Sequence, residues 1–350
     1  MKTANAFIRK LEKLKKRLSF AMYCLPKGDD EWFVSQTKKL GKEKNVVSLS
    51  AEEGDGKRVP YHIYIPASYS GFFSNFNRVL AYLYFADCYH LAPVVEYSPE
   101  NPYAEKIAVN GSSNPFEYYF HQPAGIELED LKKQPVVLHS RRENCWLANE
   151  LDDVRANYTR SDRFIAEMGR MIHTYIRLKP EVSEPLQKER TALIRGKKTL
   201  GVHVRGTDFK WNYNGHPVCI TVEEYLKKAM ELVQEKKYEQ VFLATDDLDA
   251  TGRFHQEFGD RLIYYRNVVR SNGNVTVMKS ESGRENHHYL LGLEVLRDVL
   301  TLADCDGLLA GLSQVSYAAR FFKSGYGKSF DDLVILNKGI NEHTGNNCPK

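Results

Sequence analysis

A histidine, an arginine and an aspartate lie close together in the segment His203 to Asp208, which reads His-Val-Arg-Gly-Thr-Asp. The guanidinium of Arg205 is always charged and can bind two phosphate oxygens at once, and Gly206 lets the backbone approach a ligand closely. The apolar run 199–204 predicts a buried parallel strand, and ligands of open α/β sheets bind beyond the carboxyl ends of the strands. The segment therefore predicts a phosphate site at a strand end. The alternative is a surface turn with an incidental Arg–Asp pair.

A second acidic segment follows the predicted strand 241–243 and reads Ala-Thr-Asp-Asp over residues 244–247. Asp246 or Asp247 could contact a nucleotide at this strand end or cap the next helix, and for one of the two we favour capping. Residues 247–249 read Asp-Leu-Asp, the letters of a metal motif, but they lie where a helix should begin. We therefore predict no metal site.

The third segment, residues 294–316, predicts a helix, a strand and a second helix. Ser313 would begin the second helix, ahead of Gln314 and Val315, where free N–H groups and the helix dipole favour a phosphate. Asp298 on the first helix could accept hydrogen bonds from N1–H and N2–H₂ of guanine, a donor pair that no other common base offers. The alternative for Asp298 is a pair with a neighbouring arginine or a surface lysine.

A small-residue turn at 70–74 opens a predicted helix that continues to about residue 90. Its free N–H groups could bind an anion or a sugar hydroxyl. Gly71, Asn75 and Asn77 are therefore candidates for the acceptor or sugar side of a site. The alternative is a plain connection in which residue 74 or 75 caps the helix.

These segments resemble the motifs of a known enzyme group. Segment 203–208 is similar to the His-x-Arg-x-x-Asp motif of the fucosyltransferases that make α1,2 and α1,6 links, the rhizobial nodulation fucosyltransferases and the protein O-fucosyltransferases. Segments 241–246 and 294–316 resemble the second and third motifs of that group, and 70–80 more loosely resembles its Gly-x-Gly-Asn turn.

The resemblance assigns roles to residues of this sequence. It implies that Arg205 binds the β-phosphate of GDP-fucose and that His203 lines the donor site. It further implies that Asp298 binds guanine and that Ser313 contacts a phosphate. Gly206, Asp246, Gln314 and Val315 fall on motif positions beside them and complete the predicted donor site.

The fold and reaction implied by the resemblance are those of an inverting glycosyltransferase of the GT-B type. This fold has two facing Rossmann-like α/β domains with parallel sheets. The enzyme would transfer L-fucose from GDP-fucose to a glycan or lipid-linked saccharide hydroxyl in α-linkage, without a metal or other cofactor. Two alternatives stay open: a transferase for another sugar nucleotide, and a non-catalytic protein that binds a nucleotide or glycan on the same fold.

The sequence departs from the group in two ways. Many relatives carry Arg-Arg where Gly206 stands, so a second phosphate contact would have to come from elsewhere. The α1,6 enzymes carry a glutamate shortly after the motif, and none follows here. The general base therefore stays open between Asp208 and His216, with Asp208 taken as the catalytic candidate beside Arg205. The candidates for the second phosphate contact are Lys210, Arg266 and Arg270.

The elements that must position these residues alternate between strand and helix in the second half of the chain, which predicts a parallel sheet with right-handed crossovers. The first half predicts shorter strands, then helices at 151–178 and 181–194. The aromatic run 114–120 predicts a short helix that packs in a core or stacks on sugars, and we favour the core. We predict an acceptor-side domain over 1–190 and a donor domain over 191–350. The second-half elements are expected at 199–204, 221–236, 240–244, 249–258, 261–265, 285–304, 307–310, 313–323 and 333–337.

Composition sets broad limits. The 350 residues are 42% hydrophobic with a formal net charge of +4, which is typical of a two-domain globular protein and too weakly basic to favour nucleic acid. The six scattered cysteines favour free thiols, and no apolar run is long enough to span a membrane. We expect a bacterial cytoplasmic protein. Residues 6–22 predict a basic amphipathic helix, which could lie on an anionic membrane, although packing on its own domain is favoured.

Overall fold

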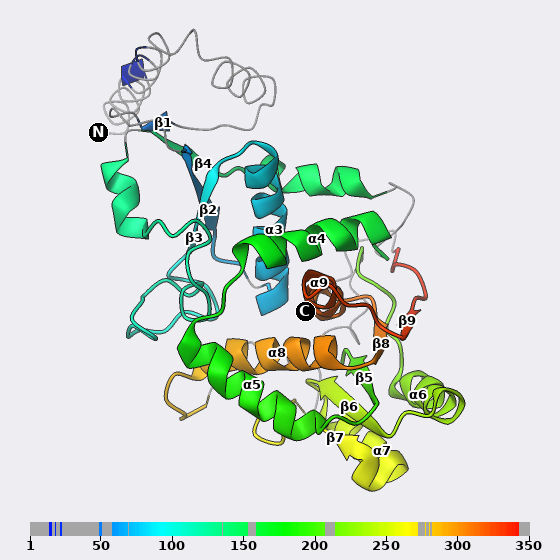
Figure 1. Ribbon diagram of the computed structural model, residues 1–350. Helices are drawn as coiled ribbons and strands as arrows, with labels where there is room; N and C mark the ends of the chain where they lie inside the picture. Colours follow the sequence, from blue (N-terminus) through cyan, green and yellow to red (C-terminus); the bar gives the residue numbers. More distant parts are fainter. Residues whose placement is uncertain are drawn as a thin grey trace.

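The computed structural model contains two β-sheets with helices around them (Figure 1). Four residues of the amphipathic helix predicted at 6–22 are described, and all four are helical. The rest of that segment lies outside the described residues, as do the candidates Asp208 and Lys210. The structure describes residues 49–50, 58–68, 70–134, 136–152, 159–206, 214–271 and 282–342, and the single residues 14, 15, 18, 22, 277 and 280.

The first sheet has the strand order β1-β4-β2-β3. Strand β2 is parallel to both of its neighbours, whereas β1 is antiparallel to β4. Helix α3 (Phe72–Cys88) connects β2 to β3 and packs against the sheet through a continuous apolar side. The strands are β1 (Leu49–Ser50), β2 (Pro60–Ile65), β3 (Ala92–Tyr97) and β4 (Val137–His139).

The start of α3 differs from the alternative in which residue 74 or 75 caps the helix. Gly71 is the N-cap residue and provides no side-chain bond. The backbone N–H of Phe72 instead donates to the hydroxyl of Tyr103, at 2.8 Å. The N-cap therefore lies three or four residues before these two positions, and the hydroxyl of Tyr103 satisfies one of the free N–H groups of the helix.

The second sheet is entirely parallel, with the strand order β7-β6-β5-β8-β9. Every residue of β5 and β6 is buried, since helices cover both faces of the sheet. The α/β class with parallel strands is thus confirmed, and β5 has the bounds predicted for it. The strands are β5 (Thr199–Val204), β6 (Gln240–Thr245), β7 (Leu262–Ile263), β8 (Gly307–Gly311) and β9 (Asp332–Leu336).

The helices of the second half lie close to their predicted bounds. The prediction for 151–178 was too long, because 162–175 is the α-helical part of its described residues and a 3-10 helix ends at residue 151. The α-helices are α4 (Asp162–Tyr175), α5 (Pro180–Ile194), α6 (Val222–Lys236), α7 (Leu248–Phe258), α8 (His287–Asp304) and α9 (Gln314–Gly325). The 3-10 helices are η2 (Leu128–Lys133), η3 (Arg142–Leu151) and η5 (Gly259–Arg261).

The larger apolar core runs through both halves of the chain. Phe76 of α3 stacks on Phe322 of α9, with ring centroids 5.7 Å apart. Helix α4 lies beside α9 (Figure 1), where a side chain at Gly169 would come within 2.6 Å of Ser324. The halves are therefore packed together through α9, and the boundary at 190/191 stays a prediction.

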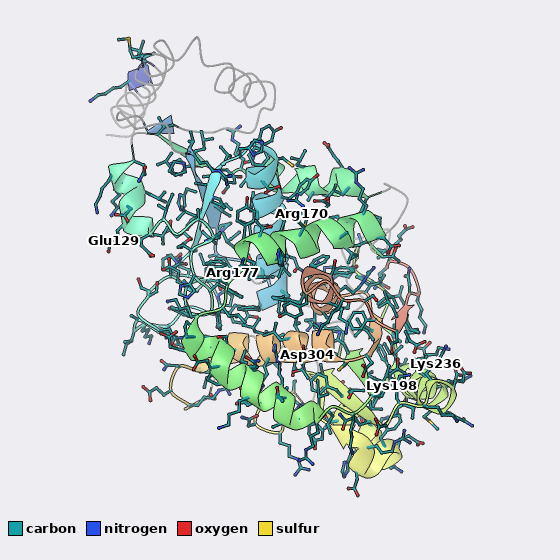
Figure 2. The ribbon with its side chains drawn as sticks, in the orientation of Figure 1. Glu129, Arg170, Arg177, Lys198, Lys236 and Asp304 are labelled. Carbon is teal, nitrogen blue, oxygen red and sulfur yellow. The ribbon has the colours of Figure 1, made fainter. Side chains whose placement is uncertain are left out.

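The aromatic segment 114–120 forms turns rather than the predicted helix. Its four aromatic side chains are at most 1% exposed and belong to the larger core. The core alternative is therefore correct, and these rings are not accessible to a sugar. Charged side chains cover the surface instead, among them Arg170 and Lys236 (Figure 2). No described helix combines the length and apolar character that crossing a membrane requires.

Candidate active site

The predicted donor residues follow three neighbouring strands of the second sheet. The strand register pairs Val204 with Thr245 and His203 with Ala310, so β5, β6 and β8 end side by side. Parallel strands place their carboxyl ends at one edge of the sheet. The residues that come next along the chain, Arg205, Asp246 and Ser313, therefore meet at that edge.

Asp246 holds the first motif in place. Its Oδ2 lies 3.1 Å from Nη1 of Arg205, and its Oδ1 accepts a hydrogen bond from the backbone N–H of Gly206 at 3.1 Å. Asp247 instead caps α7 by accepting from the N–H of Asp249, and it is 2% exposed. Asp247 is therefore the cap, and Asp246, which contacts Arg205, remains the candidate for the nucleotide contact.

Gly206 stands where no side chain fits. A Cβ atom added there would lie 2.6 Å from Cβ of Asp247 and 2.8 Å from its Oδ2. A second arginine at this position, as in many members of the resembled group, would displace the cap of α7. The packing of Asp247 thus explains the glycine and leaves room for only one arginine in the motif.

His203 and Ser313 connect β5 to the start of α9. The Nδ1 atom of His203 lies 3.3 Å from Oγ of Ser313. Burial, together with the nearby charge of Arg205, lowers the pKa of His203 to about 4. His203 is therefore neutral at physiological pH and can offer a hydrogen bond but not a positive charge.

Ser313 is the N-cap of α9. Its Oγ accepts from the N–H of Ser316 at 3.1 Å, and its own N–H donates to Oγ of Ser316. This reciprocal pair fixes the first turn of a 12-residue helix whose N-terminus faces the edge of the sheet. The predicted placement of Ser313 at a helix N-terminus is confirmed, although its phosphate contact stays a prediction.

Asp298 is the residue predicted to bind guanine. It lies partly buried on α8, and no described residue donates a hydrogen bond to it. Its neighbour Arg297 pairs with Glu189 at 2.7 Å and donates to Asn267, so the sequence alternative of an Arg297 pair is not observed. Burial raises the pKa of Asp298 to about 7, against the opposing charges of Arg297 and Arg270.

Two of the three arginine and lysine candidates for the second phosphate contact are described. Arg270 donates to the carbonyl of Tyr265 at 2.7 Å, and its guanidinium lies 5.3 Å from the ring centre of Tyr264. Arg266 is exposed. Because Arg270 interacts with Asp298 and is held by its own loop, it belongs to the Asp298 end of the site.

The candidate residues of the first half differ in what they contact. Asn75 is fully buried and bonds within its own turn, to the carbonyl of Ser70, while Gly71 is exposed. Asn77 instead reaches α9, where its Nδ2 donates to the backbone carbonyl and to Oε1 of Gln314, at 3.0 and 2.9 Å. Val315 packs against the core. The structure thus brings Asn77 and Gln314 together and leaves Val315 on the core side of α9.

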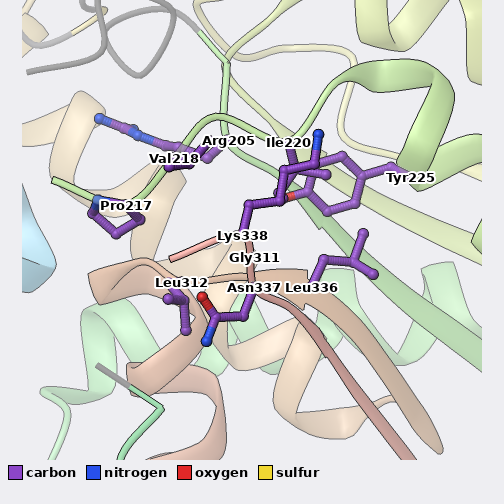
Figure 3. A pocket seen from close by; sticks show the side chains of 10 residues that line it. All are labelled: Arg205, Pro217, Val218, Ile220, Tyr225, Gly311, Leu312, Leu336, Asn337 and Lys338. Carbon is purple, nitrogen blue, oxygen red and sulfur yellow. The ribbon is translucent and has the colours of Figure 1, made fainter. Parts of the chain in front are cut away.

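A pocket at the ends of β5, β8 and β9 was missed by the sequence reasoning (Figure 3). Tyr225 of α6 is buried in its wall, and its hydroxyl lies so close to Gly311 that a side chain there would collide with it. In the sequence, the one sign that Tyr225 lines a site is its position in the first turn of α6. His216, a candidate base, is exposed. No cluster of three or more potential metal ligands is found among the described residues.

No protein-family model matches this chain, and no curated protein sequence matches it. Among solved structures, it is similar to NodZ alpha-1,6-fucosyltransferase co-crystallized with GDP, at a TM-score of 0.47 and 15% identity over 77% of this chain and 92% of that one. It is also similar to POFUT1 in complex with GDP-fucose, at 0.47 and 12% over 82% and 99%. Fucosyltransferase NodZ from Bradyrhizobium gives 0.43 and 16% over 77% and 93%.

Proposed function

We propose that this chain is a glycosyltransferase that moves L-fucose from GDP-fucose to a hydroxyl of a glycan. The observation that carries the proposal is Asp298, a partly buried carboxyl group with no described hydrogen-bond donor, which interacts electrostatically with Asp246, the partner of Arg205. A ligand that suits both residues needs paired donors at one end and an anion at the other. A guanosine diphosphate has this combination.

The reaction breaks the bond between C1 of fucose and the oxygen of the β-phosphate, and the electron pair leaves with the diphosphate. A new bond forms between C1 and the acceptor oxygen, on the opposite face of the sugar, and the acceptor hydroxyl loses its proton. Arg205 stabilises the negative charge that grows on the leaving group, which is the largest aid that a side chain can give to such a step.

His203 supports the same reaction without carrying charge. Its neutral imidazole, buried beside Ser313, can orient the hydroxyl at the start of α9 toward a phosphate oxygen. Its low pKa makes it a poor general base at neutral pH. The general base therefore stays open between Asp208 and His216, and a dissociative step would need little help from a base.

The finer parts of the proposal follow from the sequence. We propose that residues 191–350 bind the donor in a GT-B arrangement and that residues 1–190 shape the acceptor side. Inversion at C1, the α-linkage and independence from metal belong to the same proposal. So do a glycan or lipid-linked acceptor, a cytoplasmic location in a bacterium and a peripheral membrane contact through residues 6–22.

The test is a thermal-shift screen with GDP, UDP, CMP and dTDP sugars on the full chain. A ligand that binds only the folded state raises its stability, so GDP and GDP-fucose alone should raise the Tm. Equal stabilisation by UDP-sugars would contradict the guanosine assignment. Single-turnover release of GDP from GDP-fucose with a glycan mixture then separates a transferase from a binding protein, because a binding protein would hold GDP-fucose without releasing GDP.

A further inference from the structure

Arg78 is a half-buried cation on the second turn of α3. Its guanidinium makes no hydrogen bond or ion pair with any residue that the structure describes. A guanidinium has five N–H donors and keeps its charge at every physiological pH. A partly desolvated cation of this kind is suited to an anion that arrives from outside the chain.

The position of Arg78 follows from the topology. Helix α3 begins at the carboxyl edge of the first sheet, directly after β2, so its first two turns lie near that edge. The preceding residue, Asn77, bonds to Gln314 at the start of α9. Arg78 therefore stands where the first half meets the phosphate-facing end of α9.

Arg78 and Arg205 each act electrostatically on one of two neighbouring tyrosines. Burial raises the pKa of Tyr97, at the end of β3, and the charge of Arg78 opposes that rise. Burial likewise raises the pKa of Tyr103 to about 12, and there the N–H of Phe72 and the charge of Arg205 oppose it. Tyr97 and Tyr103 also interact with each other. Each guanidinium group therefore acts electrostatically on one member of this tyrosine pair, and each comes from its own half of the chain.

The charge of the leaving group exceeds what Arg205 alone can balance. A departing nucleoside diphosphate carries roughly two to three negative charges near neutral pH. Arg205 already lies 3.1 Å from the carboxylate of Asp246, and the place of a second motif arginine is closed by Asp247. A further cation must therefore come from another element.

We propose that Arg78 is this second cation and that it contacts the terminal phosphate of the donor from the side of α3. The proposal rests on the proposed function and deepens it, because it makes the diphosphate a bridge between the two halves. It replaces the sequence candidates for this contact with a residue of the first half.

The experiment compares Arg78→Gln with the matched control Lys197→Gln by calorimetry with GDP and GMP on the full chain. Lys197 is exposed and precedes β5, at the opposite edge of the second sheet, so its loss removes the same charge away from the site. Arg78→Gln should weaken the binding of GDP about tenfold or more and the binding of GMP less than about twofold. That tenfold corresponds to about 1.4 kcal/mol. Lys197→Gln should change neither.

Arg78→Lys keeps the positive charge and is the control for a folding defect in Arg78→Gln. It should retain most of the preference for GDP over GMP, with an unchanged Tm. Unchanged GDP binding in Arg78→Gln, or equal losses for GDP and GMP, would overturn the proposal while leaving the proposed function standing. A wild-type chain that binds no GDP would overturn both.

Discussion

Asp298→Asn separates recognition of the base from binding of the phosphates. Burial raises the pKa of Asp298 to about 7, so about half of the ligand-free chain carries a protonated carboxyl at neutral pH. A protonated carboxyl has one donor and fewer acceptors, and it cannot accept from both N1–H and N2–H₂ of guanine. GDP should therefore bind the ionised form.

The expected size of the pH effect follows from that pKa. The ionised fraction falls from about 0.9 at pH 8 to about 0.1 at pH 6. The apparent Kd for GDP should consequently rise about tenfold, or about 1.4 kcal/mol. The terminal phosphate of GDP also titrates in this range. The pH profile of Asp298→Asn, which lacks the carboxyl, therefore serves as the baseline.

At pH 8 the variant should bind GDP more weakly by about 1.5–3 kcal/mol, the usual contribution of a charged hydrogen bond. It should prefer xanthosine diphosphate, because xanthine replaces the N2 donor with a carbonyl that the asparagine amide can donate to. Calorimetry from pH 6 to pH 8 measures both effects. Wild-type affinity for GDP in the variant, with the same pH profile, would refute guanine recognition by Asp298.

The same pKa shift predicts the opposite effect on stability. The folded-state pKa of about 7 lies above the unfolded value of about 3.9, so the folded chain holds the extra proton between them. The free energy of unfolding therefore falls as the pH rises through this window. Above pH 7, Asp298→Asn should be more stable than the wild type, by up to about 4 kcal/mol. A variant destabilised at pH 8 would show that the carboxylate has donors in solution.

Two further substitutions test the phosphate end of the site. Arg205→Ala should abolish transfer and weaken GDP binding by about 1.5–3 kcal/mol, because it removes the charged contact to the leaving group. Single-turnover release of GDP measures the loss of transfer, and unchanged turnover would rule out the proposed role of Arg205. Gly206→Ala should lower the free energy of unfolding by about 1–3 kcal/mol, because its Cβ would lie 2.6 Å from Asp247; denaturant titration measures this, and an unchanged midpoint would show that Asp247 moves aside at no cost.

The strands of the second half were predictable because burial on both faces produces apolar runs, and the helices because their apolar residues recur at helical spacing. Strand β5 has the predicted bounds 199–204, and α6 begins one residue after its predicted start. The segment 114–120 was mispredicted for a local reason. The side chain of Asn114 bonds to the backbone N–H of Tyr97 and the carbonyl of Val95, and such side-chain bonds compete with helix formation.

The site was predictable where residues follow strands and unpredictable where it depends on distant partners. Sequence could not decide between Asp246 and Asp247, since both precede a helix and only the packing beside Gly206 separates them. Tyr103 reaches α3 from 31 residues away, and nothing in its surroundings in the sequence marks it. Arg78 resembles any charged residue on a helix surface until its lack of a described partner is seen.

In the proposed donor complex, the order of the charges at this edge would fix the direction in which the nucleotide binds. Arg205 and Arg78 gather positive charge near the start of α9, while Asp298 offers acceptors on α8. A ligand turned the other way would place its phosphates against Asp298 and leave the donors of its base facing two guanidinium groups. Like charges brought together in a partly buried site are unfavourable, so this orientation is rejected. Asp246 contributes to the discrimination, because its charge further raises the pKa of Asp298 and at the same time holds Arg205 at the strand end.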